Sequence, residues 1–470
     1  MLLIKNIKIV DGSGEPARQG DVLVSGDIIS AIGHFPHKKA ETVIDGLGMY
    51  LTPGFIEPHT HADHLLTLFT DPEQKEYRAQ GITTIVGGND GISLAPIIYG
   101  SLRSLEKWTD TNAINVNWHS VSEFIQAITH RSLGVNFGTL VGYETVRRDI
   151  TQETNTDLTH REYAVLFHTI EQALHEGALG ISVNLTKAYN EGIAHHELMA
   201  AAKTAARLNR LLALHPGAED DHYMEMVSRA LLLYKKTGVT ILLKKFVPRV
   251  INAARAQEYL RAYDALHNAG DNLFIEIACA ETTVMPLYEL LPHWAQGKSC
   301  AAMYATLQNP SHRKQIAKEL PRLKSARVIR APREYQRLIG KTLEEYALSR
   351  GSSFKEGVLA LMDCTKLHAV LLVPQDTDTI LAAHLMEYPH ILFSGQPRAF
   401  FKAADRKRWP VEKTVSRITA VPAHAYNLKH RGLIRENYYA DLVVMNDRYE
   451  IIHTIVGGSA ASNAGRFIPC

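Results

Sequence analysis

Cysteine is scarce in this chain of 470 residues, and its scarcity excludes two common kinds of small-domain architecture. The four cysteines, Cys279, Cys300, Cys364 and Cys470, include no pair at CxxC spacing. The sequence therefore predicts neither a disulfide framework nor a structural zinc ribbon. An excess of either charge is also missing, since 51 basic residues balance 49 acidic ones to a net charge of +2. Such a balance favours neither nucleic acid nor a membrane surface as a partner.

Long apolar runs are missing as well. No run approaches the roughly 18 consecutive apolar residues that a membrane-spanning helix requires. The first 15 residues, MLLIKNIKIVDGSGE, read as a short strand and a turn rather than a signal peptide, because no apolar core with a cleavage site follows. We therefore expect a cytoplasmic protein with a small-molecule substrate and no nucleic-acid or membrane partner. A homo-oligomer is compatible with the sequence.

The hydrophobic pattern divides the chain into three parts. Residues 1–50 hold short β-like runs separated by glycines. From Leu51 onward, apolar runs of strand length alternate with helical patterns, which indicates parallel strands joined by crossover helices. The strand candidates are residues 82–86, 139–141, 180–183, 211–214, 239–243 and 273–277, with helices at 195–208 and 223–236. Short β-like runs return at 432–434, 440–445 and 452–456.

This pattern predicts an α/β protein with a (β/α)8 TIM barrel and a small β-sandwich domain built from both chain ends. A barrel core takes roughly 250 residues, so the chain has room for both parts. We place the first part of the small domain at 1–52, the barrel at 53–415 and the rest of the small domain at 416–470.

Two histidines at the end of the first predicted barrel strand form the sharpest motif. His59 and His61 lie in the segment PGFIEPHTH, residues 53–61. Side chains at positions i and i+2 of a strand point to the same side, so two imidazoles can share a metal ion. A hydrogen-bonded surface pair is the competing interpretation. The apolar strand and the preceding Pro-Gly turn favour the metal site.

The same segment resembles the first-strand signature of the amidohydrolase superfamily. Other segments resemble its D-aminoacylase branch, the N-acyl-D-amino-acid deacylases, and they follow one another almost from end to end. They are QGITTIV (80–86), GNDGISLAP (88–96), LVGYETVR (140–147), EGALGIS (176–182), LPHWA (291–295) and RGLIRENYYADLVV (431–444). The resemblance implies a divalent metal ion, zinc in the first instance, and hydrolysis of an amide C–N bond. In that chemistry the ion activates water and a carboxylate moves the proton.

The resemblance also implies a set of ligands. His59 and His61 match the first-strand ligands, and His215 matches the histidine that ends the fifth strand. Asp90 stands where D-aminoacylases have a ligating cysteine, and oxygen in place of sulfur makes a harder site. Simple turn formation is an equally good interpretation of Asp90, because Asn-Asp-Gly is a favourable turn sequence.

Two strands depart from the family pattern. The sixth should end in Ser-His but ends in Lys-Lys, with Lys245 in the place of the histidine as a possible site residue. A protonated lysine has no lone pair, so it ligates only if deprotonated or carboxylated, and otherwise its ammonium group takes the place of the ion. The eighth strand lacks the aspartate that shuttles the proton, and Gly395 or Gln396 stands there. No catalytic residue can therefore be assigned.

Other positions near the expected site also differ. Tyr143 replaces a family histidine, and Ala-Cys-Ala at 278–280 replaces a Tyr-Pro-Tyr segment that shapes the substrate pocket. We expect the remaining carboxylates that could compensate to lie on the surface or in loops. These are Glu219, Asp220, Glu276 and Glu281.

Two functional hypotheses follow. The first is a metal-dependent hydrolase of a non-peptide C–N bond, acting on an N-acyl amino acid or a cyclic amide. The second is a catalytically impaired relative that is retained for binding or assembly. The second arises because removal of a general base alone costs on the order of 10²–10⁴ in rate.

Overall fold

The protein was analysed as a computed structural model. It describes the chain except residues 101, 103–104, 110–113, 152–156, 186–193, 216–222, 247–252, 280–281, 298, 375–384, 386, 407 and 460–470. The side chains at 223–225, 245–246, 253–256, 259 and 279 also lie outside the description. Among the described helices, none combines the length and the apolar run needed to span a bilayer.

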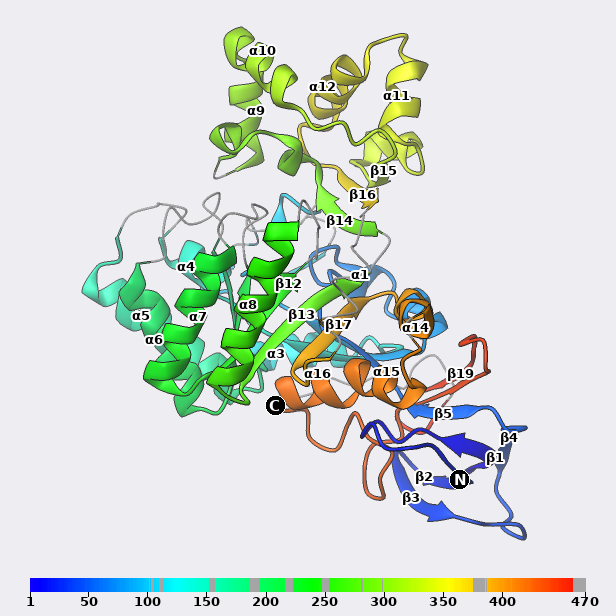
Figure 1. The fold of residues 1–470 in the computed structure, drawn as a ribbon. Helices are drawn as coiled ribbons and strands as arrows, with labels where there is room; N and C mark the ends of the chain where they lie inside the picture. The colour runs from blue at the N-terminus through cyan, green and yellow to red at the C-terminus, as the bar shows by residue number, and fades with distance from the viewer. Residues whose placement is uncertain are drawn as a thin grey trace.

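One sheet contains strands from both ends of the chain (Figure 1). Its strands are β1 (Leu2–Ile9), β2 (Arg18–Ser25), β3 (Ile28–Gly33), β4 (Thr42–Asp45), β5 (Tyr50–Pro53), β18 (Leu442–Met445) and β19 (Ile451–Ile455). They run in the order β19-β18-β5-β1-β2-β3, with β4 beside β1. Strand β18 is antiparallel to β5, which brings the last strands of the chain onto the first. The inward side chains, among them Ile4, Val22 and Val444, form a buried core of their own.

The predicted strand at 432–434 is wrong. In the structure these residues form no strand, because the backbone turns at Gly432, whose φ is +80°. A Cβ added at Gly432 would lie 2.6 Å from the Cβ of Ala423. The positive φ of Gly432 is incompatible with an extended strand. The chain also passes too close to Ala423 to accommodate a larger residue at this position.

Nine parallel strands form the larger part of the molecule. They are β6 (Phe55–Glu57), β7 (Ile82–Gly87), β8 (Asn136–Thr139), β9 (Val141–Gly142), β10 (Gly180–Asn184), β11 (Leu211–His215), β12 (Thr240–Phe246), β13 (Leu273–Cys279) and β17 (Ile391–Gly395). They make two sheets, β6-β7-β8 and β9-β10-β11-β12-β13-β17. Five of the six strands predicted between residues 82 and 277 are confirmed with small differences at their ends, whereas the one predicted at 139–141 spans the break between β8 and β9. Among the described residues no ladder joins β8 to β9 or β17 to β6, so no closed barrel is detected.

Helices cover the outer side of these strands (Figure 1). They are α1 (Thr67–Thr70), α2 (Lys75–Ala79), α3 (Val121–Thr129), α4 (Tyr143–Thr151), α5 (His160–His175), α6 (His195–Arg207), α7 (Tyr223–Thr237), α8 (Ala253–Ala269), α14 (Pro397–Arg406), α15 (Val411–Ile418) and α16 (Ala420–Ala425). Local sequence sets some of their starts: Thr159 and Glu162 form a capping box at the first turn of α5.

The inward faces of the strands share a second apolar core. It contains Ala213, Leu242, Phe274 and Leu392, closed at one end by Tyr426 directly after α16. Because side chains alternate along a strand, the residues two positions further on also face inward. This alternation places four polar side chains at the C-terminal ends of the strands. They are His215, Lys244, Glu276 and Ser394.

A separate unit is inserted between β13 and β17 (top of Figure 1). It comprises β14 (Thr282–Pro286), η4 (Leu287–Leu290), η5 (His293–Ala295), α9 (Cys300–Gln308), α10 (Pro310–Glu319), β15 (Arg327–Arg330), η6 (Arg333–Leu338), α11 (Leu343–Ser349), α12 (Phe354–Thr365) and β16 (Val370–Pro374). The strands form an antiparallel sheet in the order β14-β16-β15. The unit has its own hydrophobic core, which includes Leu307, Val328 and Met362. The predicted barrel at 53–415 did not anticipate this unit.

Candidate metal centre

The four predicted ligands meet at the C-terminal ends of the parallel strands. His59 and His61 follow β6, Asp90 follows β7, and His215 is the last residue of β11. Their side chains are 2–13% exposed, so water has little access to any of them. The structure thus brings together residues that lie up to 156 positions apart in the sequence (215 minus 59).

These residues divide into two groups that share Asp90. The first group is His59, Asp90 and His215, and the second is His61, His64 and Asp90. Within each group, one ligand atom from each residue lies within 4.8 Å of the others. His59 and His61, which the sequence placed on one ion, therefore belong to different groups. His64 was not predicted, although its position three residues after His61 was a readable signal.

The distances in the first group suit a small divalent ion. Asp90 Oδ2 lies 3.4 Å from His59 Nε2, and Asp90 Oδ1 lies 2.8 Å from His215 Nδ1. Ligand atoms about 2.0–2.1 Å from a tetrahedral zinc ion lie roughly 3.3 Å from one another. The residues present therefore fit such an ion in spacing and in chemical type.

Second contacts fix which ring nitrogen of His59 faces the group. Its Nδ1 lies 3.0 Å from Glu276 Oε1, a contact in which the ring donates its proton to the carboxylate. The lone pair is then on Nε2, which points toward Asp90. Metal-binding histidines commonly have a carboxylate in this position, where it orients the ring and raises its basicity.

His215 is held differently. Burial lowers the pKa of His215 to about 4, so the ring is neutral at pH 7. Its Nε2 accepts the amide N–H of Asp90 at 3.1 Å. Its Nδ1, which carries the proton of the neutral ring because Nε2 accepts, faces Asp90 Oδ1 at 2.8 Å. To bind an ion through Nδ1, the ring would have to move this proton to Nε2 and give up its contact with the amide of Asp90.

Asp90 is presented by a tight turn. The amide of Ile92 donates to the carbonyl of Asn89 at 2.9 Å, and Asp90 and Gly91 have φ values of 54° and 73°. Burial alone would raise the pKa of the Asp90 carboxyl, but His215 and His59 hold it well below its usual value. Both interpretations of Asp90 thus agree with the geometry: it forms a turn, and it offers an ionised carboxylate to the histidines.

Lys244 and Glu276 occupy the opposite side of the site. Lys244 donates to the carbonyl of Pro58 at 2.6 Å and to the hydroxyl of Tyr426 at 2.8 Å, and it pairs with Glu276 at 2.9 Å. These contacts use all three N–H bonds of the ammonium group. Burial alone would lower the pKa of Lys244, but Glu276 and Tyr426 raise it above its usual value. Lys244 is therefore a cation rather than a ligand. The side chain of Lys245 lies outside the described residues.

The expectation that Glu276 is a solvated carboxylate is wrong. It is fully buried, because it lies two residues after Phe274 on the inward face of β13. The other three compensating candidates, Glu219, Asp220 and Glu281, lie outside the described residues. Burial alone would raise the pKa of Glu276, but Lys244 and His59 hold it far below its usual value.

The end of the eighth strand is occupied by contacts to other carboxylates. Ser394 donates to Glu276 Oε1 at 2.8 Å, and the amide of Gly395 donates to Glu57 Oε2 at 2.8 Å. Glu57, which was not predicted, also accepts the amide of His59 at 2.8 Å. Burial raises the pKa of Glu57 to about 7. Gly395 and Gln396, which stand in the aspartate's place, have no carboxylate, and Gln396 is exposed.

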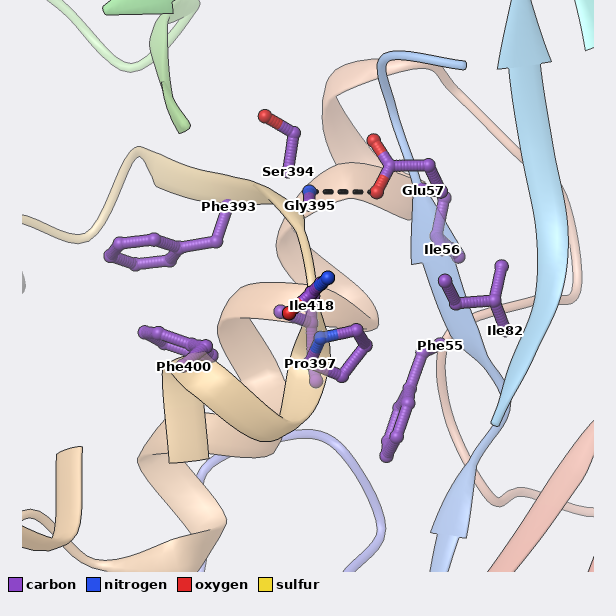
Figure 2. A pocket seen from close by; sticks show the side chains of 11 residues that line it. Phe55, Ile56, Glu57, Ile82, Phe393, Ser394, Gly395, Pro397, Phe400 and Ile418 are labelled. Carbon is purple, nitrogen blue, oxygen red and sulfur yellow. Dashed lines mark hydrogen bonds between the residues drawn. The ribbon is translucent and has the colours of Figure 1, made fainter. Parts of the chain in front are cut away.

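Figure 2 shows a small pocket beside Glu57. Apolar side chains line most of it, including Phe55, Phe393, Phe400 and Ile418. None of the four predicted ligands lines this cavity. It lies between the strands β6 and β17 and the helices α14 and α15, and we do not assign it to the metal centre.

Tyr143 has a role away from the metal centre. Its hydroxyl donates to the buried carboxylate of Glu197 in α6, which also pairs with Arg147 at 3.1 Å. This network joins α4 to α6. Among the segments with changed pocket residues, the side chain of Cys279 and residue 280 lie outside the description.

No family model matches the chain. It is 25% identical over 460 residues to the N-acyl-D-aspartate deacylase of Alcaligenes xylosoxydans xylosoxydans, covering 94% of this chain and 85% of the relative. It is 26% identical over 458 residues to the D-aminoacylase of the same organism, with 95% and 88% covered.

Among solved structures, the fold matches the N-acyl-D-glutamate deacylase of Bordetella bronchiseptica, which was solved with zinc and a phosphonate inhibitor. The TM-score is 0.81 at 21% identity, with 100% of this chain and 99% of that one covered. The resemblance seen in the sequence is thereby confirmed: over nearly its whole length the chain is similar to D-aminoacylases and N-acyl-D-amino-acid deacylases.

Proposed function

We propose that the chain is a metal-dependent hydrolase that cleaves a non-peptide C–N amide bond, with an N-acyl amino acid or a cyclic amide as substrate. The convergence of His59, Asp90 and His215 at the strand ends carries the proposal. Relatives named as deacylases support an enzyme acting on a C–N bond. Zinc in a structural neighbour supports a divalent ion, and zinc is our first choice.

The protein groups have distinct tasks in this proposal. His59, Asp90 and His215 would hold the ion, with His61 beside them. A bound divalent ion lowers the pKa of water and polarises a carbonyl. Glu276 orients the ring of His59 through the 3.0 Å contact, and Lys244 keeps Glu276 ionised.

Proton transfer is the weak part of the site. Glu276 is bound by Lys244, His59 and Ser394, which stabilise it as an anion and make it a poor base. Both oxygens of Glu57 accept backbone amides. Because the eighth strand presents no carboxylate, we expect turnover about 10²–10⁴ below that of a relative with an intact general base.

Several broader features belong to the same proposal. We propose that the parallel strands close into a (β/α)8 barrel, with β8 and β9 as one strand interrupted at Leu140. The boundaries 1–52, 53–415 and 416–470 remain our division into domains. A small-molecule substrate, no nucleic-acid or membrane partner, a cytoplasmic location and a possible homo-oligomer are proposed with it.

Metal analysis of protein purified without chelator tests the function first. We expect at least one zinc or other divalent ion per chain, lost in His215→Ala, together with slow hydrolysis of some member of a panel of N-acetyl-D-amino acids and cyclic amides. The exposed His196 provides a matched histidine for a control alanine variant. Protein that binds no divalent ion under any loading condition would defeat the proposal.

A second candidate is a relative that binds without catalysis. The Lys244–Glu276–Ser394 network favours it, because these contacts fill the side of the site opposite the histidines. Metal-dependent hydrolysis above background by the unmodified protein, abolished in Asp90→Ala, would exclude it. Tight binding of a panel compound without turnover would favour it.

A further inference from the structure

We propose that a cluster of histidines at the N-terminal ends of β13 and β17 is an acid-sensitive joint, in which protonation of His390 weakens the pairing of the two strands. Three histidines and one arginine converge there from four segments of the chain. They are His267 in the last turn of α8, His390 directly before β17, Arg417 in α15 and His424 in α16. This histidine joint lies at the opposite strand ends from the metal centre, so the inference is independent of the proposed function.

The rings of the joint pack around Phe274, the second residue of β13. The ring of His390 lies edge-on to Phe274 with centroids 5.4 Å apart, and the ring of His424 lies edge-on to it at 5.6 Å. His267 lies 6.0 Å from His390. As neutral rings, the three imidazoles pack with Phe274 like other aromatic side chains. Two protonated rings at these distances would repel each other, and more strongly where water is scarce.

The polar atoms of His390 have few partners. Its Nδ1 is buried and makes no hydrogen bond to the residues that the structure describes. Its Nε2 faces Asp271 Oδ1 at 3.9 Å, which is too long for a hydrogen bond. The carboxylate of Asp271 is also 96% exposed, so water screens its charge. Because an imidazolium ring has two N–H donors to satisfy, the folded protein disfavours the protonated form of His390.

Arg417 adds a fixed positive charge beside His390. Its guanidinium group donates to the carbonyl of Pro389, the residue before His390. It also lies over the ring of Trp409, 5.9 Å from the centroid. Burial lowers the pKa of Arg417 to about 10, so the group keeps its charge at neutral and acidic pH. A proton on His390 would therefore place a second positive charge next to one that is always present.

The other carboxylates near the joint have contacts of their own. Asp264 in α8 accepts the hydroxyl of Tyr388 at 2.6 Å. Glu387 accepts Nε1 of Trp409 at 3.2 Å. Of the charged groups around His390, the exposed Asp271 is thus the one that favours its protonation, whereas the histidines and the arginine oppose it.

These surroundings give the joint a direction of response to pH. Burial lowers the pKa of His390, and its positively charged neighbours lower it further, while Asp271 raises it. A histidine in the unfolded chain titrates near pH 6.5, so the unfolded chain takes up this proton at a higher pH than the folded protein does. The stability linked to His390 is therefore fully present above about pH 6.5 and is lost as the pH falls below that value.

The backbone of His390 connects the joint to the strand ladder. Its carbonyl accepts the amide of Ile275 in β13 at 3.1 Å, and the parallel pairing then continues from Ile391 to Gly395. The far end of β17 contacts the two buried carboxylates of the candidate site. Displacement of a protonated His390 from the joint would thus act on the strand that supports these carboxylates.

Denaturant titration of the protein as purified, at about pH 7.5 and about pH 5.5, tests the joint. Between these values the unfolding constant should rise up to about tenfold more in the unmodified protein than in His390→Phe, because the lower pH is one unit below the pKa of an unperturbed histidine. His312→Phe is the control, since His312 is exposed and lies edge-on to Trp294 at 5.5 Å. It should respond to acid like the unmodified protein. An equal response in His390→Phe would overturn the proposal.

Two measurements keep the test valid if His390→Phe folds poorly. Histidine ring signals in the NMR spectrum of the unmodified protein should show His390 titrating below pH 6.5, and titration at or above 6.5 would refute the joint. Hydrogen exchange, corrected for intrinsic rates, locates the opening. Acid should lower the protection of the Ile275 amide but not that of the Val10 amide, which donates to Leu51 in the small domain. Equal loss at both amides would show general unfolding rather than opening at the joint.

Discussion

Polar groups are buried on both sides of the candidate site, but different interactions stabilise them on each side. On the side of β6, β7 and β11, four imidazoles and a carboxylate gather with little compensation by protein cations. On the side of β12, β13 and β17, an ammonium group, a carboxylate and a hydroxyl satisfy one another. We call these the ligand side and the ion-pair side.

The contrast shows which of the buried polar groups could still hold a metal ion. On the ligand side, histidine nitrogens lie 2.8–3.9 Å from the carboxylate oxygens of Asp90, which is a spacing that a shared ion could bridge. The ion-pair side needs no ion, because Lys244 supplies the positive charge from within the chain. The contact between His59 and Glu276 joins the two sides. Substitutions at these residues test whether the ion-pair side contributes mainly to stability and the ligand side mainly to metal binding.

The largest effect should come from breaking the ion pair. In Lys244→Met the buried carboxylate of Glu276 loses its cation, and breaking such a pair typically costs about 3–5 kcal/mol. We expect that loss in the free energy of unfolding, measured by denaturant titration of metal-free protein. The double variant Lys244→Met, Glu276→Leu should recover part of it, since no uncompensated charge remains. Equal or greater loss in the double variant would show that the pair is not the source of the stability.

Removal of metal should have the next largest effect. A ligand at 100 times its Kd stabilises the folded state by about 2.7 kcal/mol, so zinc at that concentration should raise the Tm and chelator should reverse the shift. Asp90→Ala should abolish the shift, because it removes the residue common to both groups. Glu73→Ala is a control at an exposed carboxylate. A zinc-induced shift that survives in Asp90→Ala would place the ion elsewhere.

The sequence predicted the ligand side better than the ion-pair side, for physical reasons. Local apolar runs reveal where parallel strands end, and His59, Asp90 and His215 stand at or just after such ends. On the ion-pair side, the resemblance put Lys245 in the place of the family histidine. Alternation along β12 turns Lys244 inward instead, two positions after the buried Leu242.

Pairings between distant segments were not readable from local patterns. Glu276 is 217 residues from His59 in sequence, and its burial depends on the alternation along β13. Its charge alone predicted a solvated side chain, because isolated carboxylates are rarely buried. The insertion at 282–374 was missed for a similar reason: its apolar helices and strands have the same periodicities as those of the surrounding fold.

The contact between the two sides should matter for metal affinity. Glu276→Gln keeps the shape of the side chain but weakens the orientation and basicity of His59, and loss of such a contact typically costs 10–100-fold in affinity. We expect this loss in zinc affinity, measured by competition with a chromophoric chelator. Ser394→Ala is the control, since it removes another contact of Glu276 without touching His59. Equal zinc affinity in Glu276→Gln and the unmodified protein would show that the contact between Glu276 and His59 does not contribute to metal binding.

The smallest effect should come from the inserted unit. Arg330→Met removes the hydrogen bond to Thr109 but keeps the aliphatic part of the side chain, and such a bond contributes about 1 kcal/mol. Because Thr109 adjoins Trp108, whose ring stacks on His61 with centroids 4.7 Å apart, we expect zinc to bind about fivefold more weakly. Arg327→Met is the matched control, because Arg327 lies on the same strand but donates to Gly340 within the insertion. Equal weakening of zinc binding in both variants would show that the insertion does not act through Trp108.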